Sequence, residues 1–202
     1  MITKDELAAR LLHACDDVIA AEDELTEIDS KFGDAGHGLT MVKIANAIRG
    51  AVEDADGSIQ EMLDDAAMAV MVLNGGSAVP LWNTWLDGLQ EAAPDAETAS
   101  AEDVKAMFAN ALSELDDMSG AKVGDKTMMD AVIPASEAVA AAEGDVADVL
   151  AAGAAAALKG AENSKNFSSK FGRAKSYGDK TIGTPDAGAV SMARFWQGLA
   201  RA

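Results

Sequence analysis

The sequence predicts an all-α protein, and three observations support this. Apolar residues recur near the 3.6-residue helical period along most of the 202-residue chain. Residues that cap or start helices stand before several of these periodic segments. No segment reads as a convincing strand. Eight helical segments with short connections and alanine-rich faces predict a compact eight-helix antiparallel bundle or barrel.

The first expected helix runs from about Lys4 to Lys31. Its apolar residues lie on one face, and they are Leu7, Leu11, Cys15, Val18, Leu25 and Ile28. A second helix is expected over about residues 39–52.

Capping residues locate the next two helices. Ser58 and Glu61 have the spacing of a capping box and begin a third helix, which ends near Leu73. Pro80 is favoured in a first helical turn, so the fourth helix begins near it and continues to about Glu91.

Four further helices are expected in the second half of the chain. Ser100 caps the fifth, whose apolar stripe is Val104, Met107, Phe108, Leu112 and Leu115. The sixth starts after Lys126, and Pro134 should either kink it or mark its true start. An alanine-rich seventh covers about residues 146–162, and the eighth follows Asp186 to the end of the sequence.

Composition favours a single domain that spans residues 1–202, since no Pro/Ser-rich linker divides the chain. We also expect the protein to be cytoplasmic, because its one cysteine fits a reduced thiol. A net charge of −18 argues against nucleic acid and anionic membranes as partners, because both require clustered cations. The single Cys15 excludes an internal disulfide and fits a reduced core thiol. We expect no signal peptide and no membrane span, because the longest apolar run, residues 149–158, is too short to cross a bilayer.

A carboxylate loop, residues 28–38, joins the first two expected helices. Asp29 lies four residues after Leu25, on the buried side of a helix C-terminus, where a negative charge is unfavourable without a partner. Asp34 follows in a glycine-flanked turn, and two such carboxylates suit Mg²⁺. Alternatively, Asp29 bonds a lysine or a backbone amide, and Asp34 is an ordinary turn residue.

Three other connections combine glycine with polar groups. Residues 74–80 let backbone amides approach an anion at a helix start, although a helix C-cap followed by a turn explains them equally well. Residues 124–128 open another helix with a similar mixture. Between Lys159 and Lys180, six basic residues stand with only two acidic ones, a local balance of +4. This basic segment is a candidate phosphate-binding loop, with a solvated charge run as the alternative.

Together these segments resemble the ADP-binding L subunit of the dihydroxyacetone (glycerone) kinases, in the type linked to the phosphotransferase system. The resemblance covers nearly the whole chain. The matching motifs are Leu25-Thr26-Glu27-Ile28-Asp29, Gly33-Asp34-Ala35-Gly36-His37-Gly38, Gly75-Gly76-Ser77-Ala78-Val79-Pro80-Leu81, Gly124-Asp125-Lys126-Thr127-Met128, Gly172-Arg173-Ala174 and Ile182-Gly183-Thr184-Pro185-Asp186-Ala187-Gly188-Ala189.

The resemblance implies an eight-helix antiparallel barrel with ADP or ATP in the loops at one end and Mg²⁺ between the phosphates and loop aspartates. It implies a kinase subunit that works with a substrate-binding partner subunit. The phosphoryl group would pass from the nucleotide to dihydroxyacetone, or a related short ketose, held on that partner. A phosphoryl carrier of the phosphotransferase system is a second implied partner. Whether the chain forms a homodimer stays open.

Matched position by position, the resemblance implies Asp29 and Asp34 as metal ligands and assigns no catalytic residue. The implied nucleotide contacts are His37, Gly38, Leu39, Thr40, Ser77, Ala78, Met128, Arg173, Asp186, Ala187 and Gly188.

The chain departs from the family motif at Gly36, where the family carries a third aspartate before the histidine. Losing this carboxylate should weaken metal binding and make a second metal less favourable. Two functions therefore stay open. One is a working kinase subunit, and the other is a divergent, catalytically weak module that docks on the substrate subunit or on a regulator.

Overall fold

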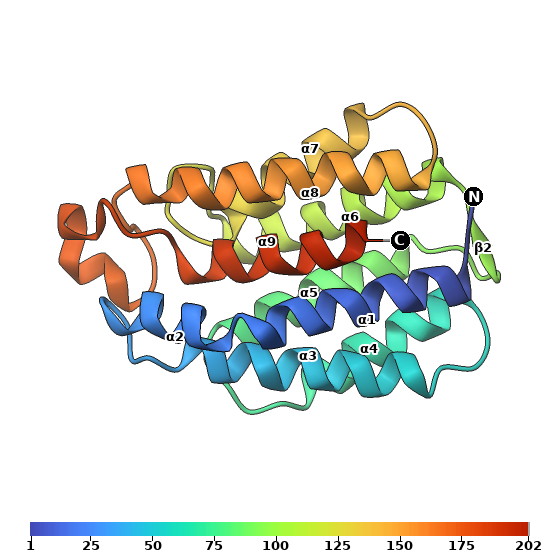
Figure 1. The fold of residues 1–202 in the computed structure, drawn as a ribbon, viewed down its shortest axis with the longest axis horizontal. Helices are drawn as coiled ribbons and strands as arrows, with labels where there is room; N and C mark the ends of the chain where they lie inside the picture. The colour runs from blue at the N-terminus through green and yellow to red at the C-terminus, as the bar shows by residue number, and fades with distance from the viewer. Residues whose placement is uncertain (202) are drawn as a thin grey trace.

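The computed structural model describes residues 1–201, whose regular structure is almost entirely helical (Figure 1). Within this range there are nine α-helices: α1 (Lys4–Ala20), α2 (Glu22–Ser30), α3 (His37–Glu53), α4 (Ile59–Met71), α5 (Ala78–Glu91), α6 (Ala101–Ser119), α7 (Met129–Ala141), α8 (Val146–Asn163) and α9 (Ala187–Ala200). The other regular elements are two short strands and two 3-10 helices: β1 (Ile2–Thr3), β2 (Thr98–Ala99), η1 (Ser164–Asn166) and η2 (Arg173–Thr181). The all-α prediction is confirmed.

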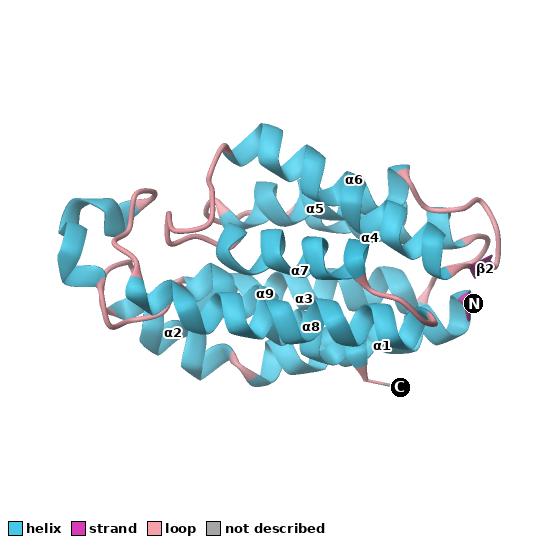
Figure 2. Cartoon of the chain, turned by 90° about the horizontal axis from the view of Figure 1, so that it is seen from above, coloured by secondary structure: helices cyan, strands magenta, loops and turns pink. Residues whose placement is uncertain are grey.

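The helices form a closed antiparallel barrel. Helices α1 and α2 together act as one member, and each later helix packs on the one before it in the chain. Helix α9 packs on both α8 and α1, which closes the ring (Figure 1, Figure 2). The barrel therefore has the eight antiparallel members that the sequence predicts.

The first expected helix is wrong in one respect, because Ala21 divides it into α1 and α2. Ala21 has φ −89° and ψ 6°, outside the helical region. Three acidic residues follow directly and occupy the first turn of α2, where negative charge is favourable. Val18 and Leu25 are both buried across the break, so the apolar stripe continues and does not reveal the interruption.

The expectation of no strand is also corrected. Strands β1 and β2 pair antiparallel, with Ile2 opposite Ala99 and Thr3 opposite Thr98. A two-residue strand is too short to produce an alternating sequence pattern. Its effect is local, since it ties the start of α1 to the start of α6 at one end of the barrel.

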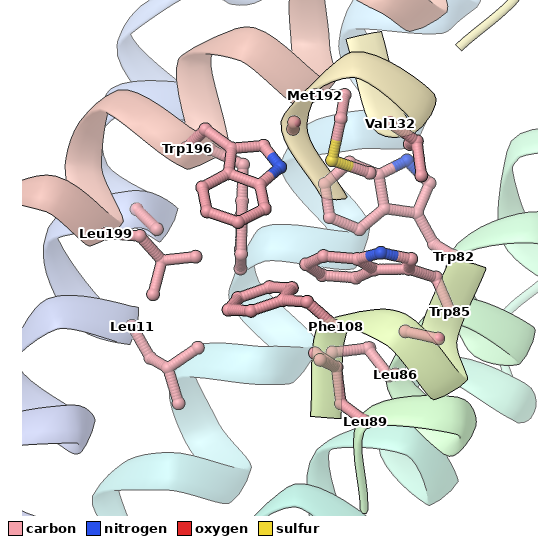
Figure 3. Close-up of a cluster of buried hydrophobic side chains, with 14 of the residues drawn as sticks. Leu11, Trp82, Trp85, Leu86, Leu89, Phe108, Val132, Met192, Trp196 and Leu199 are labelled. Atoms are coloured by element: carbon pink, nitrogen blue, oxygen red, sulfur yellow. The ribbon is translucent and has the colours of Figure 1, made fainter. Parts of the chain in front are cut away.

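Aromatic side chains fill the centre of the barrel (Figure 3). Trp82 packs edge-on to Trp85, with ring centroids 5.7 Å apart, and Phe108 lies 4.4 Å from Trp196. Such buried aromatic contacts contribute beyond their apolar area. Cys15 is fully buried in the same core, and burial raises the pKa of its thiol to about 12. The thiol is therefore a core group and stays protonated.

Helices α7 and α8 approach each other unusually closely at Gly160. Pro134 lies inside α7, which begins at Met129, so the proline does not mark the helix start. As a proline it cannot donate to the carbonyl of Asp130. A Cβ placed on Gly160 would lie 1.9 Å from that carbonyl oxygen and 2.9 Å from the Pro134 ring. The absence of a side chain at residue 160 permits this contact.

The antiparallel order places four connections at one end of the barrel. They are residues 31–36, 72–77, 120–128 and 164–186, which follow α2, α4, α6 and α8. The η2 segment in orange-red marks this end in Figure 1, and β1 and β2 lie at the opposite end. No helix within residues 1–201 is long and apolar enough to span a bilayer.

Candidate functional site

A cavity of about 600 Å³ lies at the end of the barrel where the four connections meet. This volume is typical of small-molecule sites. The expected site residues that line it are Asp29, Asp34, His37, Thr40, Ser77, Ala78, Met128, Arg173, Asp186, Ala187 and Gly188. Two others lie outside its lining. Gly38 is buried against α2, where a Cβ would lie 2.3 Å from the Glu22 carbonyl oxygen, and the side chain of Leu39 is 53% exposed.

Four helices begin at the cavity, and their N-terminal residues line it. They are α3, α5, α7 and α9, with His37, Ala78, Met129 and Ala187 as first residues. The positive ends of four helix dipoles therefore converge on this space. A polyanion is the ligand that such an arrangement attracts.

Helix capping differs between the two ends of the barrel. Thr3, Ser58, Ser100 and Asp145 each form a complete capping box, and they begin the helices that start away from the cavity. At the cavity end, the N-cap residues of α3, α5 and α7 make no side-chain capping bond. Backbone N–H groups that no side chain caps can be satisfied by a ligand.

Asp29 anchors the carboxylate loop. Its Oδ2 accepts hydrogen bonds from the backbone N–H groups of Gly36 at 2.9 Å and His37 at 3.2 Å. The backbone-amide interpretation therefore holds for this oxygen. No hydrogen bond to Oδ1 occurs among residues 1–201, and this oxygen lies beside Gly33, where a Cβ would be only 1.9 Å away.

Asp34 is exposed and forms an ion pair with Arg173 of η2. Desolvation works against ionisation of Asp34, but the hydrogen bond and charge of Arg173 outweigh it and lower the pKa of Asp34. The next residue, Ala35, has φ 59°, a left-handed conformation that is unfavourable for a residue with a Cβ. This turn directs the chain back so that Gly36 and His37 reach Asp29.

Asp29 and Asp34 are suited to bind Mg²⁺, provided that other groups supply the remaining ligands of the ion. Both line one cavity, Oδ1 of Asp29 is free of hydrogen bonds within the described chain, and Asp34 has an exposed partner that can exchange. Among residues 1–201 no group of three or more His, Cys, Asp or Glu side chains is placed to hold a metal. A magnesium ion here would need water or phosphate oxygens as further ligands, which this ion accepts readily.

His37 connects α3 to α9 in the cavity wall. Its Nε2 lies 3.1 Å from Ser191 Oγ, and that hydroxyl donates to the Gly188 carbonyl at 2.9 Å. Because the single hydroxyl proton goes to Gly188, Nε2–H of His37 is the donor in the first bond. Burial lowers the pKa of His37, so its ring is neutral at pH 7.

Lys126 is a site residue whose role the sequence does not reveal. It is 5% exposed, lines the cavity, and donates from Nζ to the carbonyls of Ser164 at 2.9 Å, Phe167 at 3.2 Å and Thr184. The ammonium therefore binds both ends of the connection 164–186 to the barrel. Its backbone has φ 60°, the second non-glycine residue with positive φ in the described chain after Ala35. Strain of this kind gathers at functional sites.

Two further carboxylates hold the loops around Lys126. Asp130, 1% exposed, accepts from the N–H groups of Gly124 at 2.6 Å and Thr127 at 2.7 Å. Asp186 caps α9 by accepting from the N–H of Ala189 at 2.8 Å. Burial raises the pKa of Asp186 to about 7, against the opposing effect of that N–H donor.

Residues 31–201 match the DAK2 domain family. The chain belongs to this family. The D-erythrulose kinase of Mycolicibacterium smegmatis is 34% identical over 194 residues, which cover 93% of this chain and 33% of that protein. The ADP-binding subunit DhaL of the PEP-dependent dihydroxyacetone kinase of Escherichia coli is 29% identical and is matched over 93% of its length.

A solved structure gives the same fold for this DAK2 domain. The dihydroxyacetone kinase of C. freundii in complex with AMP-PNP and Mg²⁺ aligns with a TM-score of 0.72 at 23% identity. The alignment covers 96% of this chain and 33% of that one. The chain thus spans about a third of the erythrulose kinase and of the C. freundii enzyme, and nearly all of the E. coli subunit.

A second hollow of the DAK2 domain, about 660 Å³, runs along α9 between α1–α2 and α8. It is a shallow surface with an alanine-rich lining. Its two arginines are already engaged, since Arg194 pairs with Glu24 at 2.8 Å and Arg201 with Asp17 at 2.8 Å. The hollow therefore presents no cation for an anionic ligand, and the end cavity is the better candidate site.

Proposed function

We propose that this DAK2 domain is the nucleotide-binding subunit of a dihydroxyacetone-type kinase, with residues 1–202 acting as one unit. The end cavity binds ADP or ATP with Mg²⁺. The phosphoryl group passes to dihydroxyacetone or a related short ketose held on a partner subunit. The erythrulose kinases among its relatives keep erythrulose among the candidate ketoses.

One observation carries the proposal, namely the convergence of four helix N-termini on a cavity lined by the expected site residues. The N-cap residues of α3, α5 and α7 make no side-chain capping bond, although Asp29 accepts from the His37 N–H and Thr127 Oγ1 from the Met129 N–H. Other first-turn N–H groups of α3 and α5, such as those of Leu39 and Ala78, are available to phosphate oxygens. Arg173 adds an exposed positive charge at the cavity rim. The apolar part of the lining, which includes Trp82, Met118 and Met128, suits a purine base.

Phosphoryl transfer requires mainly positioning and charge neutralisation. Asp29 and Asp34 would hold the magnesium ion, which would neutralise phosphate charge. The helix N-termini would orient the phosphates, and Arg173 would stabilise their outward side. The neutral His37, fixed by Ser191, would shape the cavity wall without adding charge.

Two partners follow from this proposal. The substrate subunit would dock at the cavity end, because the terminal phosphate must reach the ketose there. The E. coli relative is named PEP-dependent, which supports a phosphoryl carrier of the phosphotransferase system as the source that recharges bound ADP.

Ligand binding provides the first test. Calorimetric titration with ADP, with and without Mg²⁺, should give binding that depends on the metal, and ADP with Mg²⁺ should raise the unfolding temperature. Absence of ADP and ATP binding at millimolar concentration in the presence of Mg²⁺ would refute the proposal.

Gly36 favours a second candidate function, a binding module that transfers phosphate weakly or not at all. A Cβ on Gly36 would lie 3.2 Å from Asp34 Oδ1, so a carboxylate at residue 36 would join the metal shell, and here it is missing. Phosphoryl transfer to dihydroxyacetone after reconstitution with a substrate subunit separates the two. Tight nucleotide binding without turnover would favour the module.

A further inference from the structure

The segment between Gly172 and Gly183 has the form of a hinged flap at the cavity. Gly172 (φ 59°, ψ −158°) and Gly178 (φ 54°, ψ −130°) adopt conformations that residues with a Cβ rarely reach. Gly183, at φ 95°, ends the segment. A Cβ on any of these glycines would meet no atom within 4 Å, so these backbone positions are not closely packed. The segment is anchored at its far end, where the Gly183 N–H donates to the Lys165 carbonyl at 2.7 Å.

Two contacts join this flap to the carboxylate loop. Arg173 forms the ion pair with Asp34. Tyr177 packs on Phe32 with ring centroids 5.3 Å apart and an interplanar angle of 60°. Phe32, Asp34 and Arg173 all line the cavity, so the two contacts bridge its rim.

The two contacts respond differently to a ligand. The proposed function gives Asp34 to the metal and Arg173 to a phosphate, so their ion pair must break when the cavity fills. The aromatic contact carries no charge and competes for neither group. It is the one of the two contacts that can hold the flap in place while Arg173 changes partners.

Nothing in the barrel core requires Tyr177. Its side chain is 46% exposed, and its hydroxyl makes no hydrogen bond within residues 1–201. Its one aromatic contact within residues 1–201 is Phe32, so the ring joins the flap to the carboxylate loop. We propose that Tyr177 is a positioning residue whose ring, held on Phe32, keeps the flap across the cavity while Arg173 passes from Asp34 to a bound phosphate. This inference rests on the proposed function for the ligand and for the exchange of Arg173 from Asp34 to a phosphate, whereas the contact of Tyr177 with Phe32 does not depend on it.

The flap contact can be tested without any nucleotide. Trypsin cleaves after the flap's own Arg173, Lys175 and Lys180, and when opening is fast the cutting rate follows the open population. Tyr177→Ala should raise cutting in the flap about three- to tenfold, the range of an aromatic pair, whereas Tyr177→Phe should match the parent. Ile182→Ala, which removes a similarly exposed apolar side chain within the flap itself, is the control.

Nucleotide release provides the second measurement. With Mg²⁺ and a fluorescent ADP analogue, Tyr177→Ala should release the ligand about three- to tenfold faster, and Tyr177→Phe should restore the parent rate. Added salt should not remove this difference, because the contact is uncharged. Equal cutting and equal release in the alanine variant and the parent would overturn the inference. If the parent fails to bind ADP but Tyr177→Ala still opens the flap, the proposed function fails and the flap contact stands.

Discussion

Asp29, Asp34 and Gly36 all lie in the carboxylate loop, and they determine what this loop can bind. Asp29 divides its oxygens between the backbone and the space beside Gly33. Asp34 forms an ion pair with Arg173. The loop thus carries two carboxylates whose partners can change, and a third position where a side chain would point at Asp34.

Removal of the Asp34 carboxylate should separate metal binding from folding. We expect Asp34→Ala to weaken magnesium-dependent ADP binding at least tenfold, because one of two protein ligands is lost. The unfolding temperature should change little, since Asp34 is exposed. Calorimetry and thermal unfolding measure the two effects. An unchanged ADP affinity in the presence of Mg²⁺ would contradict the assignment of Asp34.

Gly36→Asp should restore a carboxylate beside Asp34. We expect tighter magnesium-dependent ADP binding and a lower stability of the metal-free protein, because adjacent carboxylates repel. Residue 36 is also the N-cap of α3, where Asp itself is favourable. Gly36→Asn supplies the same cap without charge and is the matched control. If Asp and Asn variants bind Mg²⁺-ADP equally, residue 36 does not face the ion.

Asp186 should make stability depend on pH. Its pKa is raised to about 7 by burial, so the native state holds a proton that the unfolded state releases near pH 4. Stability from this group is present at low pH and is lost as the pH rises from about 4 to about 7. We expect Asp186→Asn, which keeps the α9 cap, to gain roughly 2 kcal/mol relative to the parent between pH 5 and pH 8. Urea unfolding across this range checks the sign, and a constant difference would refute it.

At the scale of elements, the sequence predicts well what depends on neighbours in the chain. Ser58 and Ser100 cap their helices as expected, because a capping box requires only residues three apart. The break at Ala21 and the β1–β2 pair escape prediction, since neither interrupts the apolar period. Lys126 escapes it for a different reason. Its carbonyl acceptors lie 38 to 58 residues later, so only the closed barrel brings them together.

The contact between α7 and α8 should tolerate no side chain at Gly160. Gly160→Ala would place a Cβ 1.9 Å from the Asp130 carbonyl oxygen, which is backbone and cannot move aside easily. We expect a loss of about 1–3 kcal/mol of unfolding free energy despite the better helix propensity of alanine. Gly50→Ala in α3, where nothing lies within 4 Å, is the control and should gain up to about 1 kcal/mol. Equal effects at both glycines would show that the close approach is not limiting.

Over the whole molecule, charge is distributed unevenly. The chain carries a net charge of −18, yet the flap and its flanks are basic and lie at the cavity. An anionic ligand is repelled by most of the surface and attracted to this one end. The excess negative charges also repel one another in the compact folded state, which lowers its stability.

Salt should therefore stabilise the folded protein. Raising the salt concentration from about 0.1 M to about 1 M shortens the Debye length from about 10 Å to about 3 Å and should raise the unfolding temperature. The exposed, adjacent Asp64 and Asp65 of α4 offer a control. Asp64→Lys with Asp65→Lys makes the net charge four units less negative and should reduce the salt response. A response that does not change with net charge would contradict the repulsion argument.

Both ends of the described chain lie away from the cavity (Figure 1). The strand β1 starts the chain beside β2, and α9 runs from the cavity back toward that same end. A second polypeptide or a purification tag attached at either terminus would therefore leave the cavity rim and the flap unobstructed. The same placement is compatible with the matched relatives, in which the similar region makes up about one third of a longer chain.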